Sequence, residues 1–143
     1  MSTANRGKLL VVDDDRALGE TLALGLTKHG YEVDWRPTTS SALQALAFEP
    51  FDAVVTDLCM IGDGGIDLCV RIAESWPHVP VLVLTAFGSF ECAVQAIREG
   101  AYDFISKPVE IDILAVAVDR AVRHKQLREE VMRLRRIVSS AGR

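Results

Sequence analysis

Apolar segments of strand length alternate five times with segments that repeat apolar residues at helical spacing, and this alternation constrains the fold more than any other feature. The expected strands are Lys8–Val12, Tyr31–Trp35, Phe51–Thr56, Val81–Leu84 and Tyr102–Ile105. The expected helices are Arg16–His29, a segment that follows the capping hydroxyls of Thr38–Ser41, Ile66–Trp76, Ser89–Glu99, and a stretch from Glu110 to about Ser139. Gly30 and Gly100 stand where the first and fourth helices should stop.

This pattern favours one architecture. Continuously apolar strands that alternate with amphipathic helices are typical of parallel strands covered on both faces. We therefore predict an α/β fold, a flavodoxin-like doubly wound (βα)5 parallel sheet with strand order 2-1-3-4-5 and an extended C-terminal helix. No glycine-rich dinucleotide motif and no P-loop lysine motif follows a predicted strand, so the sequence does not support nucleotide binding of either kind.

Composition narrows the class of protein. The chain has 143 residues, of which 49% are hydrophobic, and a formal net charge of −4, which suits one globular domain and does not indicate a nucleic-acid-binding surface. Apolar runs fall short of the roughly 18 residues of a membrane helix, and the N-terminus is short and polar, so we expect a cytoplasmic protein without membrane contact. Cys59, Cys69 and Cys92 lack metal-ligand spacing and are expected to be reduced, packed thiols.

Polar side chains follow four of the predicted strands directly. Asp13 and Asp14 follow the first strand, Asp57 the third, Thr85 the fourth and Lys107 the fifth. Each could by itself be a helix cap or an exposed surface group. Ligands of an open parallel sheet, however, bind at the carboxyl ends of its strands, so the five side chains are expected in one pocket.

Clustered carboxylates resist ionisation unless a cation compensates their charge. Mg²⁺ fits best, because it takes oxygen ligands while it keeps several waters. A hydroxyl and an ammonium beside such an ion can then hold a phosphoryl group.

The sequence resembles the receiver domain of two-component response regulators. The motifs are VVDDD at Val11–Asp15, TDLCM at Thr56–Met60, LTA at Leu84–Ala86 and SKP at Ser106–Pro108, and the match runs from about Lys8 to Arg123. The resemblance implies a regulatory domain that accepts a phosphoryl group from a sensor histidine kinase. It would not be an enzyme in the usual sense, since it catalyses only its own phosphorylation and dephosphorylation.

The resemblance also implies roles for individual residues. Asp57 would be the phosphoacceptor. Asp14 and Asp57 would ligate Mg²⁺ directly, Asp13 would act mainly through water, and the backbone carbonyl of Cys59 would complete the protein ligands.

The resemblance also implies a change of conformation on phosphorylation. Thr85 and Lys107 would contact the phosphoryl oxygens, and Phe104 matches the aromatic residue that turns inward when Thr85 moves. The Lys107–Pro108 peptide bond is expected to be cis, as in the family.

The run Thr85–Pro108 resembles receivers of the nitrogen-regulator type, which control ATPases that activate transcription by the alternative-sigma-factor RNA polymerase. The sequence would then be a fragment of a protein with ATPase and DNA-binding output domains, and the segment itself would not bind nucleic acid. It departs from the family at Ile61, where proline is usual, at Gly64, where aspartate is frequent, and at Val109, where phenylalanine is common.

The C-terminal stretch carries a second pattern. Leu127, Val131, Leu134 and Val138 are spaced by 4, 3 and 4 residues, as in a two-heptad coiled-coil seam. We predict a homodimer through this helix, with Glu130 near a partner's Arg135. The alternative is an amphipathic tail that lies on its own domain. The expected organisation is a disordered tail at 1–7, the receiver domain at 8–123 and a helical linker and dimerisation segment at 124–143.

Two other functions compete with a receiver that drives a transcription-activating output domain. One is a free-standing receiver or phosphorelay carrier that acts through protein binding, against which the C-terminal seam argues. The other is a small-molecule phosphatase or phosphotransferase with an aspartyl nucleophile. Such enzymes need a cap that encloses the substrate, for which this chain has no room, and favour an acid where Cys59 stands.

Overall fold

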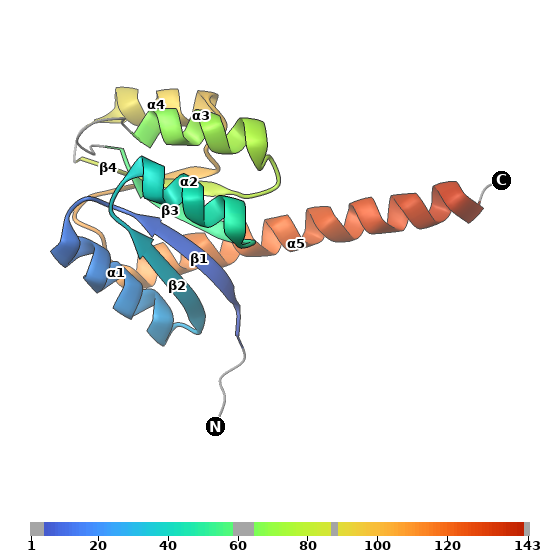
Figure 1. The fold of residues 1–143 in the computed structure, drawn as a ribbon, viewed down its shortest axis with the longest axis horizontal. Coiled ribbons are helices and arrows are strands. Elements are labelled where there is room, and N and C mark those ends of the chain that lie inside the picture. The colour runs from blue at the N-terminus through green and yellow to red at the C-terminus, as the bar shows by residue number, and fades with distance from the viewer. Residues whose placement is uncertain (1–4, 59–64, 87–88, 142–143) are drawn as a thin grey trace.

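The protein is an open five-stranded parallel sheet with helices on both faces, in a computed structural model that describes residues 5–58, 65–86 and 89–141 (Figure 1). The strands are β1 Gly7–Val12, β2 Tyr31–Arg36, β3 Ala53–Asp57, β4 Val81–Thr85 and β5 Asp103–Ser106. Their order is β2-β1-β3-β4-β5, and each neighbouring pair is parallel. The predicted fold class and strand order are confirmed.

The helices follow the predicted alternation, with ends that differ by one or two residues. They are α1 Arg16–Lys28, α2 Thr39–Phe48, α3 Gly65–Ser75, α4 Phe90–Arg98 and α5 Ile111–Ala141. Local signals account for several ends. The Thr38 and Ser41 hydroxyls form a reciprocal capping box at α2, and Gly30 and Gly100 adopt φ values of +98° and +110° after α1 and α4. At the other end of the domain β1 begins at Gly7, inside the segment that the sequence suggested as a tail.

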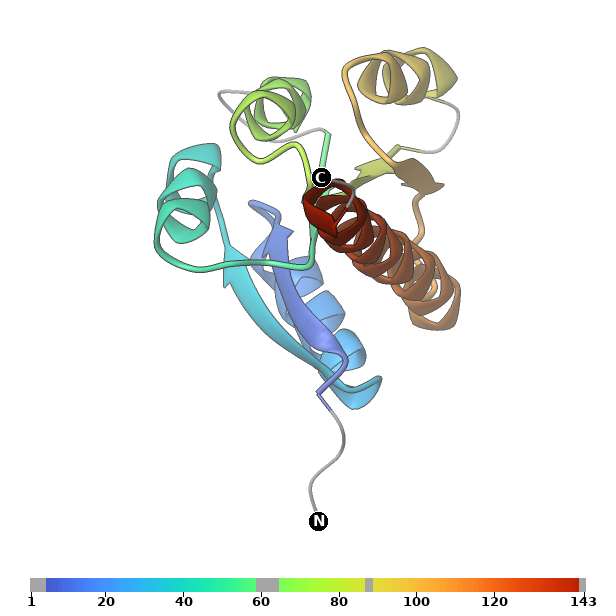
Figure 2. The ribbon, with the colours of Figure 1, turned by 90° about the vertical axis from the view of Figure 1, so that its right-hand side faces the viewer.

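Two apolar cores lie on opposite faces of the sheet, because successive strand residues point to opposite sides. Leu10 and Val12 pack with α2, α3 and α4, whereas Leu9 and Val11 pack with α1 and α5. Figure 2 shows the two groups of helices on either side of the sheet. With both faces covered, the carboxyl-terminal edge of the sheet is where polar side chains can gather.

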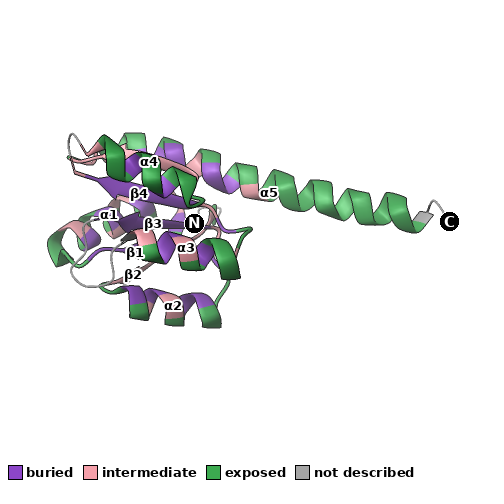
Figure 3. Ribbon diagram, turned by 90° about the horizontal axis from the view of Figure 1, so that it is seen from above, coloured by how far each residue is buried: buried purple, intermediate pink, exposed green. Residues whose placement is uncertain are grey.

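Helix α5 leaves the domain and continues as a single projecting rod (Figures 1 and 3). Its first turns are buried through Leu114 and Val118, but every residue from 126 to 140 is exposed. The Lys125 ammonium, 3.4 Å from Asp52 Oδ1 and 2.9 Å from Glu129 Oε2, ties the helix to the sheet where it emerges. The described helices include none with the length and apolar character needed to cross a membrane.

Candidate functional site

Three strand ends bring the predicted carboxylates together. Asp13 follows the last residue of β1, Asp14 comes next, and Asp57 is the last residue of β3, which pairs directly with β1. One carboxylate oxygen from each of the three lies within 4.8 Å of the other two. Residues separated by more than forty positions in sequence therefore form one compact anionic cluster.

Burial and the neighbouring charges disfavour the ionised form of Asp13. Asp13 is fully buried and Asp57 is 3% exposed, whereas Asp14 is exposed. Burial raises the pKa of the Asp13 carboxyl above its ordinary value, and the neighbouring charges of Asp57 and Asp14 raise it further. The backbone N–H of Asp15, which donates to Asp13 Oδ1 at 2.8 Å, and the charge of Lys107 act in the opposite direction.

The chemistry of the donor set fits a divalent cation. Among the residues that the structure describes, Asp13 Oδ2 is the one buried side-chain nitrogen or oxygen without a hydrogen-bond partner. A buried carboxylate oxygen with no donor is costly unless a cation meets it. Three carboxylates that offer oxygen ligands at close range form a set that suits Mg²⁺, which takes only a few protein ligands.

Lys107, directly after β5, and Thr85, the last residue of β4, lie at the same end of the strands as the cluster. The Lys107 ammonium lies 3.2 Å from Asp57 Oδ2 and is partly exposed, so it can approach an anion bound at Asp57. The backbone N–H of Lys107 donates to the Thr85 carbonyl at 2.8 Å, which fixes the two residues relative to each other. The Lys107–Pro108 peptide bond is cis, as expected.

Phe104 lies on β5 beside the site. It is half-buried and packs against the core that α2, α3 and α4 share, and it pairs in register with Val83, two residues before Thr85. Cys59, whose backbone carbonyl was predicted as a metal ligand, lies outside the described residues, as do Ile61 and Gly64.

One neighbour of the site was missed by the sequence reasoning. The indole N–H of Trp35, near the end of β2, donates to the backbone carbonyl of Asp13 at 2.9 Å. Trp35 was expected only as a strand residue, and no local motif marks it as a neighbour of the carboxylates. Only the pairing of β2 with β1 brings it there.

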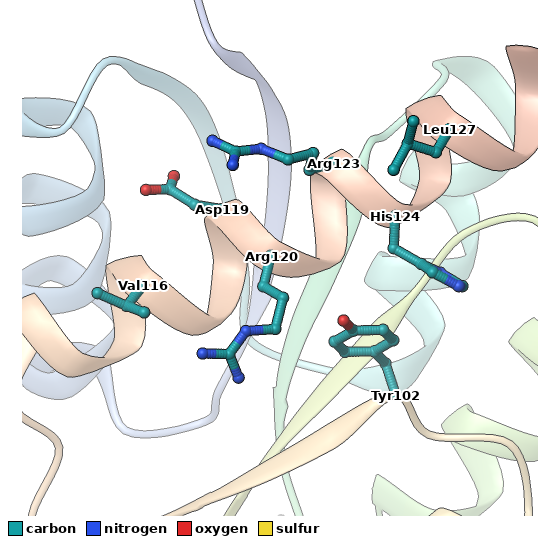
Figure 4. A pocket seen from close by; sticks show the side chains of 7 residues that line it. All are labelled: Tyr102, Val116, Asp119, Arg120, Arg123, His124 and Leu127. Carbon is teal, nitrogen blue, oxygen red and sulfur yellow. The ribbon is translucent and has the colours of Figure 1, made fainter.

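A concave surface lies elsewhere on the molecule. A pocket of about 470 Å³ between β5 and α5 is lined by Tyr102, Val116, Asp119, Arg120, Arg123, His124 and Leu127 (Figure 4). None of these belongs to the carboxylate cluster. The Tyr102 and His124 rings lie 5.5 Å apart, and Asp119 accepts hydrogen bonds from Tyr31 and Arg6, which ties α5 to the start of the sheet.

Comparison with known proteins agrees with this geometry. The sequence profile of the family described as "Response regulator receiver domain" matches residues 9–119, which include the whole cluster. The chain belongs to the response regulator receiver family. This receiver is 36% identical over 119 residues to the response regulator protein PilR of Pseudomonas aeruginosa, covering 83% of this chain and 27% of PilR.

Two further relatives indicate which type of receiver this is. It is 33% identical over 125 residues to the DNA-binding transcriptional regulator NtrC of Escherichia coli, covering 87% of this chain and 27% of NtrC. The crystal structure of NtrX from Brucella abortus superposes with a TM-score of 0.86 and 34% identity, over 94% of this chain and 30% of NtrX. The resemblance to nitrogen-regulator receivers is confirmed, and the chain spans less than a third of the length of these relatives.

Proposed function

We propose that this receiver accepts a phosphoryl group from a phosphohistidine of a sensor histidine kinase onto the carboxylate of Asp57. The observation that carries the proposal is the position of Asp57: its carboxylate meets the Lys107 ammonium at 3.2 Å and the carboxylates of Asp13 and Asp14 within 4.8 Å. A nucleophile, a cation site and a fixed positive charge therefore converge on one strand end.

The transfer follows from these groups. An Asp57 oxygen attacks phosphorus, the O–P bond forms as the P–N bond breaks, and the electron pair of that bond returns to the imidazole nitrogen. Asp13, Asp14 and Asp57 would hold Mg²⁺, which, when bound, neutralises charge on the phosphoryl oxygens. Lys107 supplies a second positive charge, and the hydroxyl of Thr85 donates to a phosphoryl oxygen. Positioning and charge stabilisation supply most of the catalysis in such transfers.

Phosphorylation would then change the surface formed by α4 and β5. When Thr85 moves toward the phosphoryl group, it leaves space behind it, and Phe104 can turn into that space. Support comes from the half-buried position of Phe104 against the core below α4. The change of shape would control output domains in a longer protein, which agrees with relatives that are transcription regulators. The receiver would act in the cytoplasm.

We also propose that residues 124–143 link the receiver to its output domain and join two copies. Leu127, Val131, Leu134 and Val138 are 61%, 44%, 47% and 69% exposed, and the helix that carries them projects away from the domain (Figure 3). This does not match the alternative in which the tail lies on its own domain. An exposed apolar stripe of this kind usually marks a contact surface. In the single chain, Glu130 instead pairs with Arg133 of the same helix.

The test of the central proposal is phosphorylation by acetyl phosphate in the presence of Mg²⁺, with the modified residue mapped by mass spectrometry. We expect labelling of Asp57 in the wild type, none in Asp57→Asn, and none after chelation of Mg²⁺. Asp112→Asn removes a carboxylate that is 96% exposed at the start of α5 and should be labelled like the wild type. Equal labelling of Asp57→Asn would refute the assignment.

A further inference from the structure

Trp35 holds the backbone of the metal-site loop from the side of the sheet. Its indole N–H donates to the carbonyl of Asp13 at 2.9 Å, and the N–H of Asp13 donates to the carbonyl of Arg36 at 3.1 Å. Both backbone polar groups of Asp13 are thus satisfied by consecutive residues of β2. The direction in which the Asp13 carboxylate leaves the chain depends on this arrangement.

Gly19 on α1 encloses the indole from the other side. A Cβ atom added to Gly19 would lie 2.2 Å from Trp35 Nε1 and 2.6 Å from Cδ1, so only glycine allows the helix to approach the ring so closely. Trp35 also packs against the core shared by α1 and α5. The indole is therefore held between a helix backbone and the apolar core, and its N–H is aimed at Asp13.

The loop that joins Asp13 to α1 is short. Asp15 caps α1 by accepting from the N–H of Leu18 at 3.2 Å, and its own N–H donates to Asp13 Oδ1 at 2.8 Å. Asp13, Asp14 and the first turn of α1 therefore form one connected unit. A displacement of the Asp13 backbone would shift both carboxylates that this loop contributes to the cluster.

We propose that Trp35 and Gly19 form a clamp that positions Asp13 and Asp14 for the cation, and so set the Mg²⁺ affinity of the receiver. The proposal rests on the proposed Mg²⁺-dependent phosphorylation of Asp57. Trp35 is a positioning residue, because its indole N–H acts through the backbone carbonyl of Asp13. Preorganised ligands bind more tightly because less order is lost on binding.

The expected effect lies in affinity rather than in chemistry. Trp35→Phe keeps an aromatic ring and removes the indole N–H. Loss of one neutral hydrogen bond corresponds to about a 3- to 10-fold change in an equilibrium constant. The Mg²⁺ concentration that half-saturates phosphorylation by acetyl phosphate should rise by that factor, while the rate at saturating Mg²⁺ stays that of the wild type. Gly19→Ala, which displaces the ring, should act in the same direction.

Two measurements do not depend on phosphorylation. In metal-free protein, amide hydrogen exchange at Asp13 and Asp15 should be faster in Trp35→Phe than in the wild type by about the same 3- to 10-fold. Calorimetric titration with Mg²⁺ should show the matching rise in Kd. Trp76→Phe is the control, because Trp76 follows α3 and precedes β4, at the opposite end of the strands, and should leave all three readouts unchanged.

The control variant also supplies a direct probe. The chain has two tryptophans, so Trp76→Phe leaves Trp35 as the single one, and its emission should change when Mg²⁺ binds beside Asp13. This readout tests whether Trp35 is coupled to the cation site and does not require Trp35→Phe to fold.

The outcomes separate the two proposals. The clamp would be overturned if Trp35→Phe left both the amide exchange and the Mg²⁺ midpoint unchanged. It would also be overturned if Mg²⁺ bound to the protein without any change in the emission of Trp35. Either result would leave the phosphorylation of Asp57 standing. A wild type that is not labelled at Asp57 would overturn the proposed function, and hydrogen exchange in metal-free protein would still decide whether Trp35 holds the loop.

Discussion

Asp13→Asn should stabilise the metal-free protein, although it removes a residue of the functional site. Asp13 is fully buried and its carboxylate lies within 4.8 Å of those of Asp14 and Asp57. At that separation, one pair of like charges repels by about 3.5 kcal/mol at an effective dielectric constant of about 20. Lys107 offsets part of this repulsion and solvent screens Asp14, so we expect the free energy of unfolding to rise by about 1–3 kcal/mol.

The turn itself should survive the substitution. Asparagine keeps an oxygen that can accept from the N–H of Asp15, as Asp13 Oδ1 does at 2.8 Å. Its amide nitrogen would replace the carboxylate oxygen that has no hydrogen-bond partner, and could donate to the neighbouring carboxylates. Asp15→Asn is the matched control: it retains the helix cap and lies outside the cluster, so it should change the free energy of unfolding little.

Mg²⁺ should remove most or all of the stability advantage of Asp13→Asn over the wild type. A ligand that binds only the folded state at about 100 times its Kd adds about 2.7 kcal/mol to the free energy of unfolding. The wild type and Asp15→Asn should show this gain in urea unfolding with and without MgCl₂. Asp13→Asn should show little of it, because one of the three carboxylates is gone.

The pH dependence has a definite sign. Burial raises the pKa of Asp13 in the folded protein, so the folded state binds more protons than the unfolded state between the two pKa values. The destabilisation by Asp13 is present at pH values above the raised pKa and is lost as pH falls through it. The advantage of Asp13→Asn over the wild type should therefore shrink on acidification. An advantage that stays constant, or a variant less stable than the wild type without metal, would refute this reasoning.

Three other predictions concern the switch, the tail and a buried thiol. Thr85→Ala should still be phosphorylated but should lose most of the amide chemical-shift change around α4 and β5 in NMR spectra; a full wild-type response would exclude the proposed switch. Leu127→Asp combined with Leu134→Asp should give monomers in sedimentation equilibrium, whereas Glu130→Ala should leave the association constant nearly unchanged. A wild type that is monomeric with and without a phosphoryl mimic would exclude the seam as a dimer contact. Burial raises the pKa of the Cys69 thiol to about 12, so this thiol should resist iodoacetamide at pH 8 until the protein is unfolded in urea. Cys92 is exposed and can react in the native protein, so the labelled residue is mapped by mass spectrometry. Rapid labelling of Cys69 in the native protein would contradict its burial.

Much of the fold was predictable because its determinants are local in sequence. The apolar run that forms β1, the capping hydroxyl of Thr38 and the stop glycines Gly30 and Gly100 act within a few residues of the elements they define. Parallel strand order then follows from the alternation of elements. Since side chains that follow parallel strands meet at one edge, the grouping of Asp13 and Asp57 also followed from the sequence pattern.

The tertiary structure decided what depends on residues far apart in the chain. The bond from Trp35 to the Asp13 carbonyl and the close packing on Gly19 exist only because β2 lies beside β1 and α1 crosses them, and no spacing rule encodes such contacts. The same holds for the tail. An apolar heptad pattern fits a helix on its own domain as well as one that projects away. The direction of α5 follows from its packed first turns and from the contact of Lys125 with Asp52, because these contacts join residues that lie far apart in the sequence.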